Sequence, residues 1–413
     1  PPGVTPELTL SSWWSSADAA LNAIGKQLRP VSDLVGRIWP HNERPLASQK
    51  PIYAHQLQFS GESVTEKLNR TANELNQFGV TTTILNALDE IAWLFNLRGG
   101  DFPYAPLFKS YAIVHVNFQI DPPKLFLNLS QLIAADRPTG VRVFQYEEFW
   151  SHLNATGANT SITKIWVSPR VSQGIIRLIP ENKLLQPWIN SPVQRVKARK
   201  NPIERAGMRA CQIRDAVARM KHLGWLEHEL LNGRSVNETQ SAERLLSFQQ
   251  QQEHFRSPSF NTISASGDRA AIVHYMPQAA TARNITKDKI YLLDAGGQYL
   301  DCTTDITRTH YCGTPTSLQR RAYTRVLQGV LEIADAVFPI GTYGRSLDHL
   351  GRMWLYRDVM AANTRPKQQV KNELTSTLES TNILPLTQLV EDSDDDHKKQ
   401  SNNIDQYTLE KWD

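Results

Sequence analysis

The sequence has few cysteines and no long apolar run. Three cysteines occur in 413 residues, Cys211, Cys302 and Cys312, so a disulfide framework is excluded and at most one bridge can form within the chain. Cys211 lies at an apolar position of an expected helix, which favours a buried small side chain over a nucleophile. No run of eighteen apolar residues is present, so the sequence predicts no transmembrane segment.

Basic residues form no block apart from one short stretch. The net charge is +4 at pH 7 for 413 residues, and only residues 195–200 form a basic cluster, in an expected linker. Nucleic-acid binding therefore has no support. The hydrophobic content of 40% and the charged content of 21% are typical of a globular protein, and the length predicts two or three domains.

The start of the chain and its sequons bear on the compartment. The first residue is Pro1 rather than Met, so we expect a fragment, with any signal peptide upstream of it. Six Asn-X-Ser/Thr sequons favour a secreted or cell-surface protein, since about three would arise by chance. A cytoplasmic location is the alternative, because three cysteines fit a reducing compartment equally well. The sequons begin at Asn69, Asn128, Asn154, Asn159, Asn237 and Asn284.

Two aspartates are the main candidates for a functional site. Asp294 follows an apolar run at residues 290–293 that predicts a strand, and residues 295–298, Ala-Gly-Gly-Gln, predict a turn. On the expected return strand, side chains alternate between two faces, which allows Asp305 to face Asp294 across the hairpin. Two neighbouring carboxylates are tolerated mainly when a cation lies between them or one is protonated. The spacing alone leaves open that both are solvated side chains at strand ends.

The run DAGGQYLDCTTDITRT, residues 294–309, is similar to the metal-binding hairpin of Xaa-Pro aminopeptidases in the pita-bread metallopeptidase group. The resemblance implies that Asp294 and Asp305 are ligands of a dinuclear metal centre, usually with two Mn²⁺ ions. Carboxylate ligands suit Mn²⁺, and Zn²⁺ or Co²⁺ are alternatives. Asp301, in the expected turn, does not match a ligand position.

A histidine follows a second apolar run. The segment AIVHYMP, within residues 270–277, predicts a strand, and a histidine at the end of such a strand is more often structural than catalytic. The resemblance reverses this interpretation. It implies that His274 lines the active site, where a histidine can contact the substrate or shuttle a proton near neutral pH.

A further segment, ALDEIAWLFNLRGG at residues 87–100, resembles the middle domain of animal Xaa-Pro aminopeptidases. The resemblance implies an α/β fold: a ribonuclease-H-like middle domain at residues 51–200, followed by an incomplete pita-bread α+β domain at residues 201–358. Residues 1–50 then correspond to a remnant of the N-terminal creatinase-like domain. Apolar runs predict strands at residues 81–85, 111–116, 124–129 and 165–167. A long helix from Pro202 is expected to bury one apolar stripe from Ile203 to Leu230.

The likeness ends at Asp358. The family continues with a Gly-rich His motif and two Glu-containing strands, which supply a His ligand, two Glu ligands and a further catalytic His, and none of these is present here. Residues 359–413 are instead rich in Gln, Asn, Ser, Lys and Asp, a composition that predicts disorder. No HExxH motif or paired-His spacing occurs elsewhere.

The resemblance implies hydrolysis of the bond after the first residue of peptides that carry proline at position two, by a metal-activated water. Family members are commonly homodimers. We expect this chain to be inactive because the later ligands are missing, and we favour an incomplete or mis-spliced aminopeptidase. The alternatives are a noncatalytic binding or dimerising paralogue, against which the retained Asp294, Asp305 and His274 argue, and a creatinase-like hydrolase, which the segment at residues 87–100 disfavours.

Overall fold

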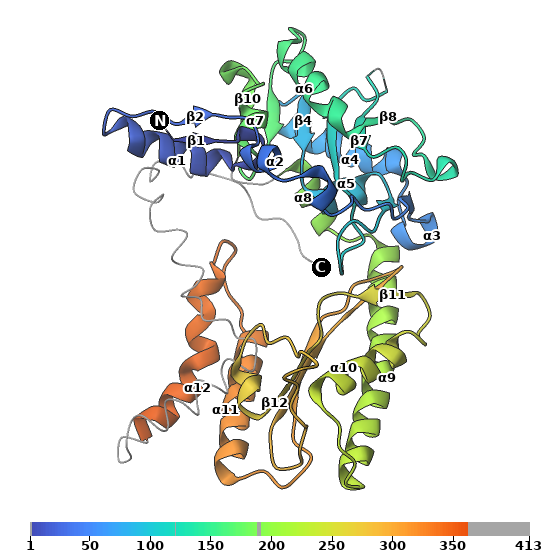
Figure 1. Cartoon of the computed structure of the whole chain (residues 1–413), viewed down its shortest axis with the longest axis vertical. Coiled ribbons are helices and arrows are strands. Elements are labelled where there is room, and N and C mark those ends of the chain that lie inside the picture. Colours follow the sequence, from blue (N-terminus) through green and yellow to red (C-terminus); the bar gives the residue numbers. More distant parts are fainter. Residues whose placement is uncertain (1, 120, 188–190, 362–413) are drawn as a thin grey trace. The chain divides into compact units, whose positions relative to one another are not determined.

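The computed structural model describes residues 2–119, 121–187 and 191–361, which form two compact units (Figure 1). The first unit contains the described residues up to Asp215, together with Glu253–Phe260 and Gly297–Thr304. The second contains Ala216–Gln252, Asn261–Gly296 and the described residues from Asp305 onward. The disorder expected from residue 359 lies almost entirely outside the described residues, because the last described helix, α12, spans Asp348–Ala361.

A six-stranded sheet organises the first unit, in the order β10-β9-β4-β6-β7-β8. Strands β4, β9 and β10 run parallel to one another and β7 runs parallel to β8, while β6 is antiparallel to both β4 and β7. The four strands predicted from apolar runs are confirmed to within two residues at each end. The strand bounds are β4 Thr82–Leu85, β6 Ser110–His115, β7 Lys124–Leu127, β8 Arg142–Gln145, β9 Ile165–Val167 and β10 Leu184–Leu185.

Helices cover both faces of this sheet. Because side chains alternate between the two faces along β6, Ile113 belongs to one apolar cluster and its neighbours Ala112 and Val114 belong to another. Each face of the sheet therefore has its own core. One cluster includes apolar side chains of α4, α5 and α8, and the other includes those of α6 and α7. The unit is therefore a three-layer α/β structure. The helix bounds are α4 Val64–Gln77, α5 Leu88–Leu94, α6 Phe149–Ala158, α7 Gln173–Ile176 and α8 Pro192–Ala198.

Shorter elements complete the first unit. Strands β1 and β2 pair in parallel, β3 pairs antiparallel with β5, and β11 pairs antiparallel with β14. The strands are β1 Gly3–Val4, β2 Arg29–Pro30, β3 Tyr53–Ala54, β5 Leu97–Arg98, β11 Phe255–Pro258 and β14 Gly297–Tyr299, and the helices are α1 Ser11–Asn22, α2 Leu34–Ile38 and α3 Leu57–Ser60.

A three-stranded antiparallel sheet, in the order β12-β13-β15, forms the centre of the second unit. Helix α10 packs against β12, and its Leu245 shares a core with Tyr291 and Leu293 of β13. Helices α11 and α12 pack against each other. The bounds are α10 Glu238–Gln249, β12 Ile263–Ser266, β13 Tyr291–Ala295, β15 Ile306–His310 and α11 Ser317–Ala334.

The long helix α9, Pro202–Leu231, begins at the predicted proline, but the prediction of a single buried stripe is wrong. Leu226 and Leu230 are buried, whereas the side chains of Ile213 and Met220 are 68% and 73% exposed. The predicted stripe combined residues from two faces of the helix. The buried face follows a different set of residues that includes polar side chains, namely Cys211, Asp215, Ala218, His222 and Leu226.

Candidate metal centre

The hairpin that carries the two aspartates turns later than predicted. Residues 295–298 do not reverse the chain, because β14 continues outward to Tyr299, and neither Gly296 nor Gly297 has a positive φ. The reversal follows Tyr299, whose N–H donates to the carbonyl of Cys302 at 2.8 Å. Gly297 instead allows the backbone to pack closely against the Tyr299 ring, since an added Cβ would lie 2.7 Å from that ring.

Asp294 and Asp305 lie on the same face of the β13–β15 pair. Asp294 on β13 is directly opposite Thr307 on β15, and Asp305 precedes Thr307 by two residues. Because strand side chains repeat with period two, Asp305 is the diagonal neighbour of Asp294 rather than its direct partner. The expected pairing of the two carboxylates is therefore confirmed in face and corrected in register.

The electrostatics of this pair favour a cation. Asp294 is 5% exposed, and burial raises the pKa of its carboxyl group. A hydrogen bond from Thr307 opposes this shift, while the nearby charge of Asp305 raises the pKa of Asp294 further. A buried carboxylate held beside a second carboxylate is stabilised as an anion by a bound divalent ion, so the two side chains fit a metal as ligands.

Arg219 on α9 holds the two strands together beside the pair. Its guanidinium group donates to the backbone carbonyl of Ile306 on β15 at 2.8 Å and to that of Ala295 on β13. These carbonyls belong to the residues that follow Asp305 and Asp294 in the chain. The buried arginine thus fixes the relative position of the strands, and its charge lowers the pKa of Asp294. Nothing in the sequence pattern indicated this role.

No third ligand joins the two aspartates within the described part of the chain, where no group of three or more His, Cys, Asp or Glu side chains could hold a metal ion. Asp301, which did not match a ligand position, is engaged elsewhere, since Arg214 donates to both of its carboxylate oxygens at 2.6 Å. The site contributed by the described residues is thus a carboxylate pair.

The strand predicted around His274 is wrong. Residues Gly267–Ala271 form a 3-10 helix, and His274 lies in the following turn with its side chain exposed. The neighbouring Tyr275 is anchored instead, because its hydroxyl donates to Glu238 at 2.7 Å and Glu238 also binds Arg269 at 2.7 Å. This buried carboxylate holds the segment as a loop. The role of His274 in an active site stays a prediction.

A disulfide joins Cys211 on α9 to Cys302 at the tip of the hairpin, 91 residues later in the chain. The interpretation of Cys211 as a simple buried hydrophobic residue is therefore incomplete, although its burial and the limit of one bridge are confirmed among the described residues. Close by, the hydroxyl of Tyr299 donates to Asp215 at 3.0 Å. The tip that separates the two aspartates in sequence is thus attached covalently to a helix.

Two family models match consecutive parts of the chain. The first, the Creatinase/Prolidase N-terminal domain, matches residues 43–204, and the second, Metallopeptidase family M24, matches residues 203–372. Xaa-Pro aminopeptidase 2 of Sus scrofa is 39% identical over 366 residues, covering 86% of this chain and 53% of the relative. The chain belongs to the Xaa-Pro aminopeptidase family. A probable Xaa-Pro aminopeptidase P of Paracoccidioides lutzii is 37% identical over 372 residues, covering 86% of this chain and 59% of the relative.

Solved structures agree with this assignment. The X-prolyl aminopeptidase of Caenorhabditis elegans, described as a cytosolic enzyme with a di-nuclear active site, matches with a TM-score of 0.79 at 31% identity, covering 86% of this chain and 58% of that one. The prolidase of Pyrococcus furiosus, at 20% identity and a TM-score of 0.52, shares the fold. The creatinase and pita-bread fold expected from the sequence is confirmed. The chain spans between 53% and 59% of the length of the curated relatives named above.

The comparisons leave the compartment open. Among the described helices, none combines the length and the apolar character that crossing a membrane requires.

Proposed function

We propose that Asp294 and Asp305 are ligands of a divalent metal centre that serves removal of the first residue from peptides with proline at position two. The observation that carries this proposal is the placement of a buried aspartate and a second aspartate on one face of the β13–β15 pair. Oxygen ligands favour Mn²⁺, and Zn²⁺ or Co²⁺ are the alternatives. In such enzymes the bound ions supply hydroxide at neutral pH and polarise the scissile carbonyl.

The chain's own residues have distinct tasks in this proposal. Asp294 and Asp305 hold the ion, and the Thr307 hydroxyl orients Asp294 through a hydrogen bond. Arg219 keeps the strand ends in register through the carbonyls of Ala295 and Ile306. His274 is assigned to contact with the substrate or to proton transfer, and its exposed position leaves its side chain free to meet a peptide.

The carboxylate pair alone predicts weak metal binding and no turnover by the 413-residue chain. Two carboxylates leave a divalent ion with mostly water ligands, and little then orients the ion or the attacking water. The family's later His and Glu ligands have no match in these residues. We expect no release of alanine from Ala-Pro-Ala in Mn²⁺. Turnover that falls after Asp305→Asn would overturn this expectation.

Metal binding is tested directly by electron paramagnetic resonance of added Mn²⁺. We expect Asp305→Asn and Asp294→Asn each to weaken binding at least tenfold. Asp288→Asn is the matched control, because Asp288 is an exposed aspartate of the same unit that lies outside the pair. Equal binding by the wild type and both pair variants, with unchanged circular dichroism, would refute the metal centre.

A noncatalytic binding or dimerising role is the second candidate. The observation that favours it is an apolar stripe on α11, where Tyr323, Leu327 and Leu331 are half-exposed at helical spacing. A homodimer through this face predicts a concentration-dependent mass in light scattering, and Leu327→Glu is expected to abolish that dependence. A monomer at all concentrations would remove the dimerising role.

An oxidising compartment fits the described residues best. The Cys211–Cys302 disulfide is typical of secreted or surface proteins, and the sequon residues Asn69, Asn154 and Asn159 are exposed. Expression of the natural gene in its own cells is expected to yield a protein that loses mass on treatment with peptide N-glycosidase. An unglycosylated protein with three free thiols would place it in the cytoplasm.

A further inference from the structure

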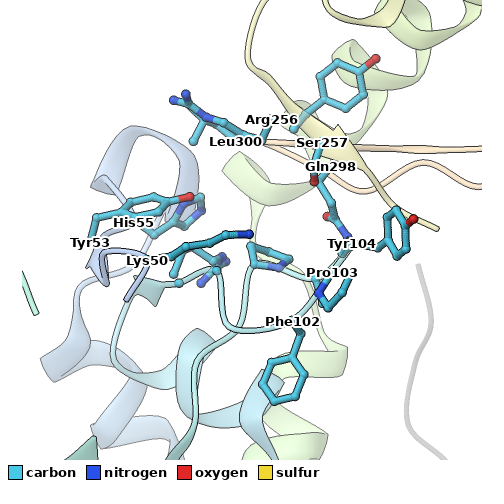
Figure 2. A pocket seen from close by; sticks show the side chains of 16 residues that line it. Lys50, Tyr53, His55, Phe102, Pro103, Tyr104, Arg256, Ser257, Gln298 and Leu300 are labelled. Atoms are coloured by element: carbon cyan, nitrogen blue, oxygen red, sulfur yellow. Dashed lines mark hydrogen bonds between the residues drawn. The ribbon is translucent and has the colours of Figure 1, made fainter. Parts of the chain in front are cut away.

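The first unit contains a cavity of about 210 Å³ that the proposed metal chemistry does not use (Figure 2). Its walls come from β3, from the loop that follows β5, and from the paired strands β11 and β14. Figure 2 shows Lys50 and His55 on one side, Tyr104 with Gln298 on the other, and Arg256 above them beside Ser257 on β11. The volume corresponds to roughly seven water molecules, and is below that of a pocket for a whole drug-sized ligand. The cavity therefore suits a terminal group or a single side chain.

The charge around this cavity is positive. Lys50, Arg98 and Arg256 line it, and no carboxylate is among the described residues that do so. Arg98 is held from behind, because its guanidinium group donates to the backbone carbonyls of Ala92 at 3.1 Å and Leu97 at 2.9 Å. Lys50 and Arg256 are exposed, and neither forms an ion pair with a described residue. Arg98 interacts with the charge of Glu204, so Lys50 and Arg256 are the cations available to attract an anion.

A neutral histidine adds a directional hydrogen bond. His55 is 9% exposed; its Nδ1 atom is closed off from solvent and has no hydrogen-bond partner among the described residues, so a ligand in the cavity can meet only the exposed remainder of the ring. Burial, with the charges of Arg98 and Lys67, lowers the pKa of His55 to about 3. Its ring is therefore uncharged at neutral pH and carries one N–H donor.

Gln298 and Tyr104 form the opposite wall. The Gln298 amide donates to the backbone carbonyl of Tyr104 at 2.9 Å, and Tyr104 has a φ of +65°, which a non-glycine residue rarely adopts. Gly100 permits close packing, because a Cβ at this position would come within 2.7 Å of the Lys50 side chain. The aromatic rings of Tyr53 and Tyr104 give the cavity apolar walls.

We propose that this cavity binds a peptide carboxylate, with Arg256 and Lys50 contacting the charge and His55 donating a hydrogen bond. The ligand's identity as a peptide rests on the proposed aminopeptidase function, whereas its negative charge follows from the cavity alone. The apolar walls suit the methylene or aromatic part of the residue that carries the carboxylate. Two sources supply this group: the C-terminal α-carboxylate and an acidic side chain.

Binding is measured by calorimetry on the full chain with an acetylated peptide, Ac-Gly-Pro-Gly-Phe, in EDTA. Acetylation and EDTA remove any contribution of the metal centre, so a failure of the metal proposal does not affect this test. We expect the C-terminal amide to bind at least tenfold more weakly than the free acid. Ac-Gly-Pro-Gly-Glu-NH₂ separates the sources, since binding as tight as the free acid assigns the site to acidic side chains.

Variants connect the binding to the cavity. Arg256→Gln and Lys50→Gln are each expected to weaken binding of the free acid about tenfold and to reduce its dependence on salt. His55→Phe is expected to weaken it about threefold. Arg142→Gln is the matched control, because Arg142 is an exposed arginine of the same unit outside the cavity, and it is expected to bind as the wild type does.

The result that overturns the proposal is equal affinity for the free acid, the amide and the glutamate amide. Equal affinity of Arg256→Gln and the wild type, with both proteins folded by circular dichroism, overturns it as well.

Discussion

The two units differ in how completely their sheets are covered. In the first unit, two apolar clusters lie on opposite faces of the six-stranded sheet, and central strand residues such as Ile113 and Phe126 are fully buried. In the second, the three-stranded sheet has smaller clusters, and helix α11 exposes Leu327 and Leu331. The aspartate pair lies in the less covered unit. The comparison indicates that the larger apolar cores and the proposed metal ligands lie in different parts of this chain.

The largest expected effect comes from the core of the first unit. Phe126 on β7 is fully buried among Phe144, Phe149 and His152, so Phe126→Ala is expected to lower the free energy of unfolding by about 3–5 kcal/mol. Leu327→Ala on the exposed face of α11 is expected to cost less than about 1 kcal/mol. Guanidinium unfolding measures both. Equal costs would show that the α11 face is covered in solution.

Loss of the disulfide is expected to have the next largest effect. Because the bridge closes a loop of 91 residues, Cys302→Ser is expected to destabilise the first unit by about 2–4 kcal/mol. Cys312→Ser changes the free cysteine and is the comparison variant; because Cys312 packs against the apolar cluster of the second unit, it is expected to leave the stability of the first unit unchanged. Thermal unfolding with and without a dithiol reductant measures the difference. A wild type that is insensitive to the reductant would argue against the bridge.

Because His55 is buried, we expect the stability of the first unit to depend on pH. Its pKa is about 3 in the folded chain, against 6.5 for a histidine exposed to water. Between these pH values the unfolded chain binds the extra proton, so stability is present above pH 6.5 and is lost as the pH falls toward 3. The expected slope is about 1.4 kcal/mol per pH unit. The free energy of unfolding is measured at several pH values for the wild type and for His55→Gln, and the variant is expected to lack the slope that His55 causes. Identical slopes for the two proteins would contradict this prediction.

The smallest expected effects come from removing an equivalent N-terminal helix cap in each unit. Ser63 caps α4 by accepting a hydrogen bond from the Glu66 N–H at 3.3 Å, and Thr316 caps α11 by accepting one from the Gln319 N–H at 3.2 Å. Ser63→Ala and Thr316→Ala are each expected to cost about 1 kcal/mol. Hydrogen exchange of each helix measures the local change. A much smaller cost at Thr316 would show that α11 is frayed before the cap is removed.

Local periodicity predicted the strands of the first unit well. Runs of apolar residues encode buried strands directly, which is why β4, β6, β7 and β9 were found from the sequence. It failed where a distant contact decided the conformation. The apolar segment around His274 is a loop because Glu238 anchors Tyr275 and Arg269, and the stripe on α9 was assigned to the wrong face because its buried face carries Asp215 and His222.

The candidate sites divide in the same way. The eleven-residue spacing of Asp294 and Asp305 identified the acidic pair, since both side chains belong to one hairpin and strand geometry relates them. Their register could not be predicted, because it depends on where the chain reverses. The cavity gave no signal in the sequence: His55, Arg98 and Arg256 lie on three separate segments and meet only in the folded unit.

The sequence by itself determined the family, four strands of the first unit and the identity of the two aspartates, because each depends on residues close together in the chain. The tertiary structure decided the diagonal placement of those aspartates, the Cys211–Cys302 bridge and the cationic cavity. These features join residues that are far apart in sequence, and their contacts form only when distant segments pack together.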